Sequence, residues 1–249
     1  SAMLMRAASS MVRHFRMKSL ISSERFFPNV IGCLATFSKS SFSFLHYHGV
    51  VPCSNSYRIT PIDQMSFLED AQGHLNVLLR ESGTGEGMWG AQRGGGRLAL
   101  LRVPLAAFGD GRTAAERGHY QRLPGDPGMG AQNRYVGDWL LWGGDKGGWA
   151  TRLGDEGSAV TLSPGHAVER IEALGRHAVL VGSAGRELHF SAVRLSDDGA
   201  RLAGHHVVAD ARQGETRTHG FFYRATDERA GLLGLPVLGT SDDEIGTAS

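Results

Sequence analysis

The sequence predicts an all-β fold, and two observations support that prediction. Short runs of β-favouring residues recur between turn signals over residues 59–239, and 33 of the 35 glycines of the 249-residue chain lie after residue 58. The glycines keep no period of three, which excludes collagen, so we expect them in the turns of a strand-rich domain. Apart from 113–117, no segment suggests a helical period, so helices should be few.

Twelve runs are expected to form strands that pair antiparallel with their neighbours in sequence. These runs are 64–68, 74–80, 97–103, 134–142, 149–153, 159–162, 168–174, 177–181, 187–195, 202–208, 216–224 and 231–237. Between them stand dipeptides that tolerate the positive φ of tight hairpins, namely Gln72-Gly73, Asp110-Gly111, Gly175-Arg176, Ala184-Gly185 and Asp198-Gly199.

An internal repeat narrows the architecture. Residues 137–143 and 175–182 both read as a glycine, a polar residue, an apolar run and a closing glycine, with an offset of 38 to 39 residues. That offset is close to the blade length of about 40 to 45 residues in four-stranded propellers. The sequence therefore predicts a propeller-like fold that is incomplete, because the last unit is too short for four strands. A β-sandwich or an open barrel is the alternative.

Charge and glycine divide the chain near residue 58. Residues 1–58 hold seven basic residues and one acid, whereas residues 59–249 hold 19 basic and 24 acidic residues. The net charge of +1 is therefore the sum of +6 in the first part and −5 in the second. We expect a basic, Ser-rich extension over 1–58 that is poorly structured, a β domain over 59–239, and an acidic flexible tail over 240–249. The acidic β domain lacks the basic field that phosphate binding needs, which argues against nucleic acid as a partner.

The N-terminal part allows several interpretations. It has no run of 18 apolar residues, so no transmembrane helix is expected. The residues before Cys33 satisfy the last positions of a lipoprotein signal, and the Ser-rich, Arg-bearing composition is that of a transit peptide. Polar residues interrupt the apolar stretch that a secretory signal requires, so a poorly structured extension, or sequence read from the wrong start, is favoured over both. Cys33 and Cys53 could pair only after export.

Four segments resemble a known group of proteins. They are 171–182 (IEALGRHAVLVG), 187–190 (ELHF), 213–223 (QGETRTHGFFY) and 231–237 (GLLGLPV). This sequence resembles secreted bacterial proteins with a C-terminal β-propeller domain distantly related to WD-type repeats, over roughly residues 59–239. The resemblance implies a propeller fold and an extracellular setting, and it implies no catalytic residues.

Three polar residues form the candidate catalytic group. If 216–223 is one strand, Arg217 and His219 share a face with two aromatic side chains, and Glu215 stands just ahead of them at the same parity. In a hydrolase, His219 could serve as general base, with Glu215 orienting it and Arg217 holding an anion. In a propeller, the same groups could form a buried polar network that joins neighbouring blades. We favour the network, because no motif marks a nucleophile beside them.

The candidate binding residues are three others. Trp89 and Arg93 lie in a long glycine-rich loop, where an aromatic anchor among adaptable neighbours suits recognition, although an ordinary loop is the simpler interpretation. Trp142 is expected to pack between blades, with carbohydrate binding as the alternative. Residues 85–90 have the spacing of a dinucleotide-binding motif, but the glycines after them cannot open the required helix, so no cofactor is expected.

The late histidines (His166, His177, His189, His205, His206 and His219) are interpreted as strand-surface and turn residues. His205 and His206 are adjacent and should point to opposite faces of a strand, and the metal-binding motifs with fixed spacing are missing, so no metal is expected. The sequence as a whole favours a secreted or envelope-associated recognition module without catalytic activity that binds a protein or a glycan. The alternatives are a hydrolase that uses Glu215, Arg217 and His219, and a cytoplasmic location.

Overall fold

The expected all-β fold is confirmed. A computed structural model describes residues 58–82, 95–107, 115–155, 159–215, 218–227 and 230–239. These residues form seventeen strands and four 3₁₀ turns, η1 (Gln64–Ser66), η2 (Leu105–Ala107), η3 (Arg117–His119) and η4 (Thr218–Gly220). All strand pairs in this part of the chain are antiparallel.

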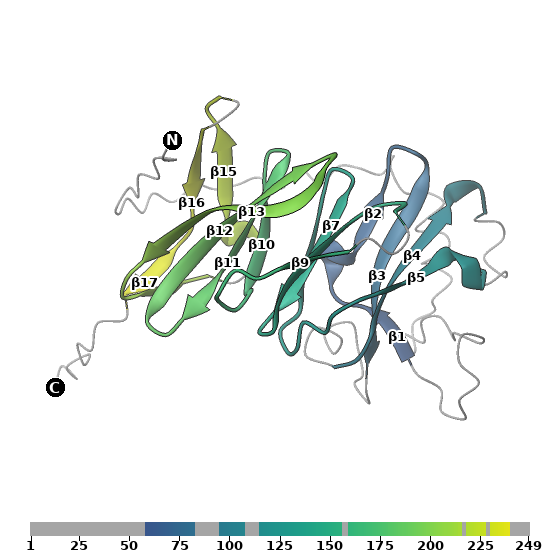
Figure 1. The fold of residues 1–249 in the computed structure, drawn as a ribbon, viewed down its shortest axis with the longest axis horizontal. Coiled ribbons are helices and arrows are strands. Elements are labelled where there is room, and N and C mark those ends of the chain that lie inside the picture. The colour runs from purple at the N-terminus through teal and green to yellow at the C-terminus, as the bar shows by residue number, and fades with distance from the viewer. Residues whose placement is uncertain are drawn as a thin grey trace.

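The strands form three consecutive sheets and a smaller C-terminal unit (Figure 1). The first sheet runs β1 (Arg58–Pro61), β3 (His74–Ser82), β4 (Leu98–Pro104), β5 (Tyr120–Leu123), and β2 (Phe67–Glu69) also pairs with β3. The second runs β6 (Gln132–Val136), β7 (Trp139–Gly144), β8 (Gly147–Arg152), β9 (Val160–Leu162). The third runs β10 (Arg170–Leu174), β11 (His177–Ala184), β12 (Glu187–Ser196), β13 (Gly199–Val208). In the C-terminal unit β14 (Ala211–Gln213) pairs with β17 (Val237–Gly239), and β15 (Phe222–Ala225) pairs with β16 (Gly231–Gly234).

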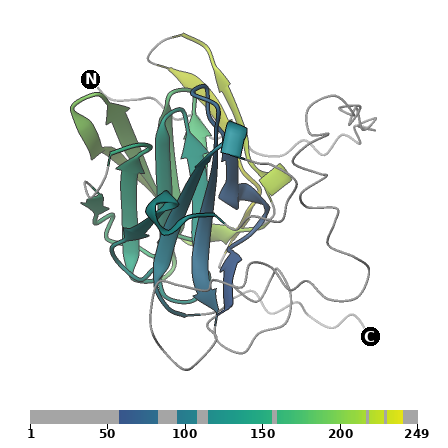
Figure 2. The same cartoon turned by 90° about the vertical axis from the view of Figure 1, so that its right-hand side faces the viewer.

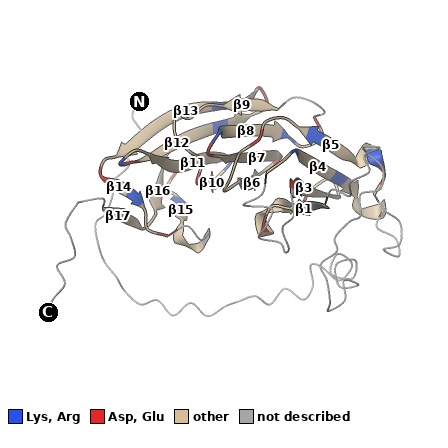
Figure 3. Cartoon of the chain, turned by 90° about the horizontal axis from the view of Figure 1, so that it is seen from below, with Lys and Arg blue, Asp and Glu red and all other residues tan. Residues whose placement is uncertain are grey.

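Each sheet shares an apolar core with the next. Leu78 and Leu100 of the first sheet meet Trp142 of the second, and the opposite face of the second sheet packs Leu141 against Leu180 of the third. The far face of the third sheet packs on the C-terminal unit. Figure 2 views this stack from the side of the first sheet, and in Figure 3 the first strands β6 and β10 lie on one side and the last strands β9 and β13 on the other.

The repeat found in the sequence relates the second sheet to the third. A shift of 38 residues places β6 on β10 and the start of β7 on the start of β11, and the turn glycines Gly137 and Gly175 both have positive φ, at 56° and 62°. The same shift places Gly144 on Gly182. A Cβ at Gly144 would lie 2.1 Å from the carbonyl oxygen of Pro127, and one at Gly182 would lie 1.8 Å from that of Ala167. In both sheets the loop that enters the first strand therefore rests directly on a glycine of the second strand.

Several expected strand boundaries are wrong. The run 134–142 is two strands, β6 and β7, joined by the turn at Gly137, and the run 231–237 contains β16 and the start of β17. The run 64–68 begins with η1, because the Asp63 side chain accepts a hydrogen bond from Met65 N and caps that turn. The run 216–224 does not form one strand, since η4 precedes β15. The short strands β1, β5 and β14 were not expected.

Candidate functional site

A line of polar side chains runs from the η1 turn of the first sheet through β6 and β10 to β14, and we call it the inner seam. It consists of Asp63, Ser66, Asn133, Arg134, Arg170, Glu172 and Gln213. Between the first and second sheets, Asn133 Nδ2 donates to Asp63 Oδ1 at 2.9 Å and to Ser66 Oγ at 3.3 Å. All three residues are buried. Beside them the Tyr135 hydroxyl donates to the carbonyl of Ser66, and burial raises the pKa of Tyr135.

Between the second and third sheets the seam is ionic. The Arg134 guanidinium, on β6, donates to the Glu172 carboxylate and to the carbonyl oxygen of Ile171, both on β10. On the other side of Glu172, Arg170 Nη1 donates to its Oε1 at 2.9 Å. One carboxylate thus bridges two guanidinium groups from two sheets.

Arg170 extends the seam into the C-terminal unit. Its Nε donates to Gln213 Oε1 at 2.8 Å and its Nη2 to the carbonyl oxygen of Glu215 at 2.7 Å. Gln213 Nε2 in turn donates to Glu169 Oε2 at 3.0 Å. Arg170 is 3% exposed, so its charge is held in a desolvated place where it must be paired. The seam is built to fix the sheets relative to one another.

The strand that was expected to align the candidate catalytic residues does not form over its full length. In the described residues η4 covers Thr218–Gly220 and β15 begins at Phe222, so strand alternation does not support a catalytic group here. His219 is exposed in η4, and Arg217 lies outside the described residues. Glu215 is half-buried, and its main-chain carbonyl belongs to the contacts of Arg170. The network expected between sheets has its charged members at Arg134, Arg170 and Glu172 instead.

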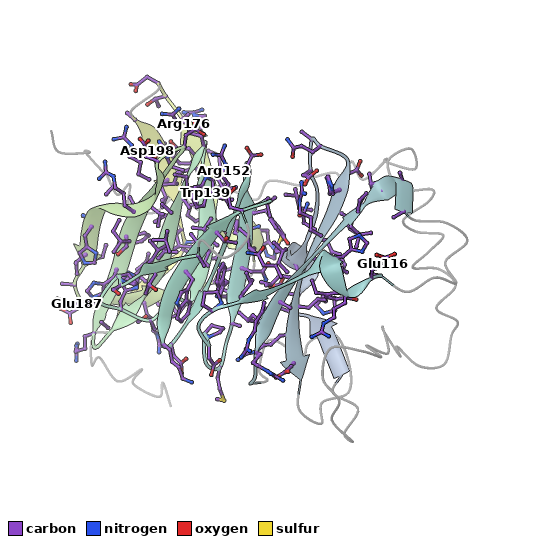
Figure 4. The ribbon with its side chains drawn as sticks, turned by 45° about the vertical axis from the view of Figure 1, so that its right-hand side comes forward. Glu116, Trp139, Arg152, Arg176, Glu187 and Asp198 are labelled. Carbon is purple, nitrogen blue, oxygen red and sulfur yellow. The ribbon has the colours of Figure 1, made fainter. Side chains whose placement is uncertain are left out.

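Of the three binding candidates, Trp89 and Arg93 lie outside the described residues. Trp142 is fully buried and stacks on Trp149 with ring centroids 6.4 Å apart, so it packs between sheets as expected, and the alternative of a binding residue does not hold. Trp139 lies on the opposite face of β7, in the core shared with the third sheet, and is labelled in Figure 4. These three tryptophans pack sheets together, and a sugar platform would need them at the surface.

Four exposed apolar side chains lie on the C-terminal unit and were not anticipated. Phe222 on β15 and Leu232 on β16 share one face of their strand pair, whereas Val237 and Leu238 follow each other on β17, which pairs with β14. All four are 41 to 50% exposed. A hydrophobic run cannot reveal such a surface from sequence, because the same pattern describes a strand that is buried. The apolar surface is defined by these four residues.

Three of the late histidines also meet, and sequence spacing did not indicate it. The rings of His166, His189 and His205 have centroids 5.1 to 6.0 Å apart. His205 and His206 point to opposite faces as expected, since His206 lies against Phe190 instead. Among the described residues, no group of three or more His, Cys, Asp or Glu side chains is arranged to hold a metal ion.

No helix within the described ranges is both long and apolar enough to cross a membrane. Comparison with protein-family models, with curated proteins and with solved structures gives no match to this chain.

Proposed function

We propose that this protein is a propeller-like recognition module without catalytic activity, secreted or held at the cell envelope, that binds a protein partner through the apolar surface of its C-terminal unit. The observation that carries the proposal is the exposure of four large apolar side chains on the strands of one small unit, with Phe222 and Leu232 on the same face of the β15–β16 pair. Exposed apolar residues that lie together mark contact sites more often than scattered ones do. A protein is favoured over a glycan because the surface is largely aliphatic and the tryptophans at 139, 142 and 149 pack within cores.

The propeller assignment rests on the repeat. Two four-stranded antiparallel meanders follow one another with an offset of 38 residues and share a core face to face. Their first strands lie together on one side. In a propeller, the first strand of each blade lines the central axis and the blades pack in sequence order. The inner seam would then lie along that axis.

A hydrolase centred on Glu215 and His219 is less well supported. A general base must lie within hydrogen-bond reach of the group that orients it, and the strand that was expected to align these residues is interrupted by η4. The charged groups of the inner seam are engaged with each other, which suits a structural role.

The proposal is tested by placing a photo-crosslinking residue at Leu232, within the apolar surface, or at Met129, a 72% exposed apolar residue far from it in sequence. We expect the same purified partner to crosslink from position 232 and not from 129. F222S and L238S should weaken binding of that partner by about tenfold or more, whereas M129S should leave it unchanged. The reason is that removing a large apolar contact from an interface commonly costs more than about 1 kcal/mol of binding free energy.

Equal crosslinking from both positions, or partner affinity unaffected by F222S and L238S, would show that the apolar surface is not the binding site. Binding on a glycan array that these substitutions leave unchanged would show recognition of a sugar elsewhere on the molecule. Either result contradicts the proposal, since the apolar surface is its single support.

A further inference from the structure

The three neighbouring histidines belong to a hydrogen-bond chain at the edge of the third sheet. His166 lies in the loop between β9 and β10, His189 and Ser191 lie on β12, and His205 lies on β13. His166 Nε2 is 2.9 Å from Ser191 Oγ, Ser191 Oγ is 3.0 Å from His205 Nδ1, and His205 Nε2 is 3.1 Å from His189 Nδ1. The chain therefore ties a loop to the β12–β13 hairpin.

One contact at the end of the chain fixes its direction. His166 Nδ1 is 2.7 Å from the carbonyl oxygen of Ala167, and a carbonyl oxygen only accepts, so His166 Nδ1 carries the proton. That carbonyl cannot move away easily, because it rests on Gly182 where no Cβ could fit. His166 is 8% exposed, and burial lowers its pKa, so the ring is neutral and its Nε2 is an acceptor.

The remaining protons follow in order. Ser191 must donate its hydroxyl hydrogen to His166 Nε2, so His205 Nδ1 must donate to Ser191 Oγ. A neutral His205 then has a bare Nε2, which accepts from His189 Nδ1. All three rings are assigned the Nδ1–H tautomer by this reasoning, because the partner of one nitrogen decides the state of the other.

The chain ends on a bare acceptor that faces a carboxylate. His189 Nε2 is buried, has no hydrogen-bond partner, and lies 3.4 Å from Glu187 Oε2. Two acceptors facing each other are unfavourable, and one proton on His189 Nε2 would replace that contact with an ion pair. Glu187 is exposed and lies at the start of β12, at the opposite end of the hairpin from Asp198 (Figure 4).

A proton on His166 Nε2 would face the Ser191 hydroxyl and no carboxylate. It would put a cation in a buried site close to two other imidazoles, which also act to lower the pKa of His166. Glu169 acts in the opposite sense on His166, but its oxygens already accept hydrogen bonds from Ser183 and Gln213.

Other charged groups around the chain are engaged elsewhere. The facing strand β9 contributes no ionisable residue, and on β8 the guanidinium of Arg152 pairs with Asp138 and Asp197. On β11 the Nδ1 of His177 accepts from Leu195 N, and on β13 His206 lies on the other face of the sheet.

We propose that His166, Ser191, His205 and His189 form an acid-sensitive latch, a one-way hydrogen-bond chain that opens when the buried Nε2 of His166 takes up a proton. Opening releases the loop 163–169 from the β12–β13 hairpin. That loop enters the third sheet, where Val168 N donates to Gly144 O at 2.8 Å and Glu169 N donates to Val181 O at 2.9 Å. The latch thus controls one of the contacts between the second and third sheets.

The first test is the tautomer of each ring. Long-range ¹H–¹⁵N correlation spectra of the intact protein near pH 7.5, about one unit above the ordinary histidine pKa, should show His166, His189 and His205 all with the proton on Nδ1. Free histidine prefers the Nε2–H form, so this outcome is specific to the chain. A single ring of the three with its proton on Nε2 would overturn the assignment.

The second test is amide hydrogen exchange at Val168 and Glu169. After correction for intrinsic exchange, acidification from about pH 7.5 to about pH 5 should increase opening at these two amides by about tenfold, with no comparable change at the buried first-sheet strands. H166Q keeps an acceptor in place of Nε2 but cannot be protonated, so its amides should stay protected. H206Q is the matched control and should respond like the unsubstituted protein.

An equal acid response in H166Q, or none in the unsubstituted protein, would contradict the latch. If H166Q does not fold, E187Q provides the second variant, since Glu187 is exposed and its loss should leave the fold unchanged. E187Q should leave the Nδ1–H tautomers and the acid-induced opening at Val168 and Glu169 as they are, because the opening proton is taken up at His166. Loss of that acid response in E187Q would show that the response comes from Glu187 and would contradict the latch.

Discussion

The third sheet is held at two edges by different chemistry. At its first strand, Arg134 and Arg170 hold Glu172 in a pair of salt bridges to the second sheet, whereas at its last two strands imidazoles and a serine form a chain to the loop that enters the sheet. A guanidinium stays charged at any pH at which proteins fold, so the inner seam has an arginine side that does not titrate. An imidazole changes its charge between about pH 5 and 8. The same interface therefore combines one permanent link and one that responds to acid.

The largest effect should come from breaking the inner seam. R170M removes a buried cation and leaves Gln213 Oε1 and the carbonyl of Glu215 without this donor, so we expect a loss of about 3 to 5 kcal/mol in the free energy of unfolding, measured with urea. R176M is the control, because Arg176 is exposed in the turn before β11. A loss below about 1 kcal/mol in R170M, with R176M unchanged, would show that the seam contributes little to stability.

The seam also shows how far sequence reasoning reaches. Alternation of apolar and polar residues predicts strands, because each strand has two faces, and it worked for β3, β4, β8 and the strands of the third sheet. It failed at 134–142, where β7 is buried on both faces and its apolar run hides the turn at Gly137. The repeat contained the missing information, since Gly175 at the corresponding place was recognised as a turn.

The candidate site was harder to predict from the sequence than the strands were. A buried network between sheets was expected around Glu215, but its charged members Arg134 and Arg170 lie 36 residues apart on two different strands, and no local pattern relates them. The histidine chain has the same origin, because β12 and β13 bring their residues beside a loop that precedes them in sequence. Strand pairing and sheet packing decide these contacts, and neither is encoded by spacing along the chain.

An intermediate effect should follow from acidification. Burial lowers the pKa of His166, so the unfolded chain binds a proton at this residue more readily than the folded protein does. The contribution of His166 to stability is therefore fully present above its unfolded pKa of about 6.5 and is lost as the pH falls toward its folded pKa. We expect a loss of stability between those of R170M and D197N, measured as the part of the acid-induced change in urea stability that H166Q lacks. An identical pH profile in H166Q would contradict it.

The smallest effect should come from a third link between the same two sheets, one that is exposed. Arg152 on β8 lies 2.9 Å from Asp197 in the turn after β12, and Asp197 is 93% exposed, so solvent screens the pair and ordering the two side chains offsets what attraction remains. Arg152 also keeps Asp138, at 3.8 Å, when Asp197 is changed. D197N should alter the free energy of unfolding by no more than about 0.5 kcal/mol in urea at low salt, and D198N serves as its control. A loss comparable to that of R170M would mean that contact between the sheets depends on charge at the surface as much as on the buried seam, and the distinction between the permanent and the acid-sensitive link would then fail to describe how this interface is held.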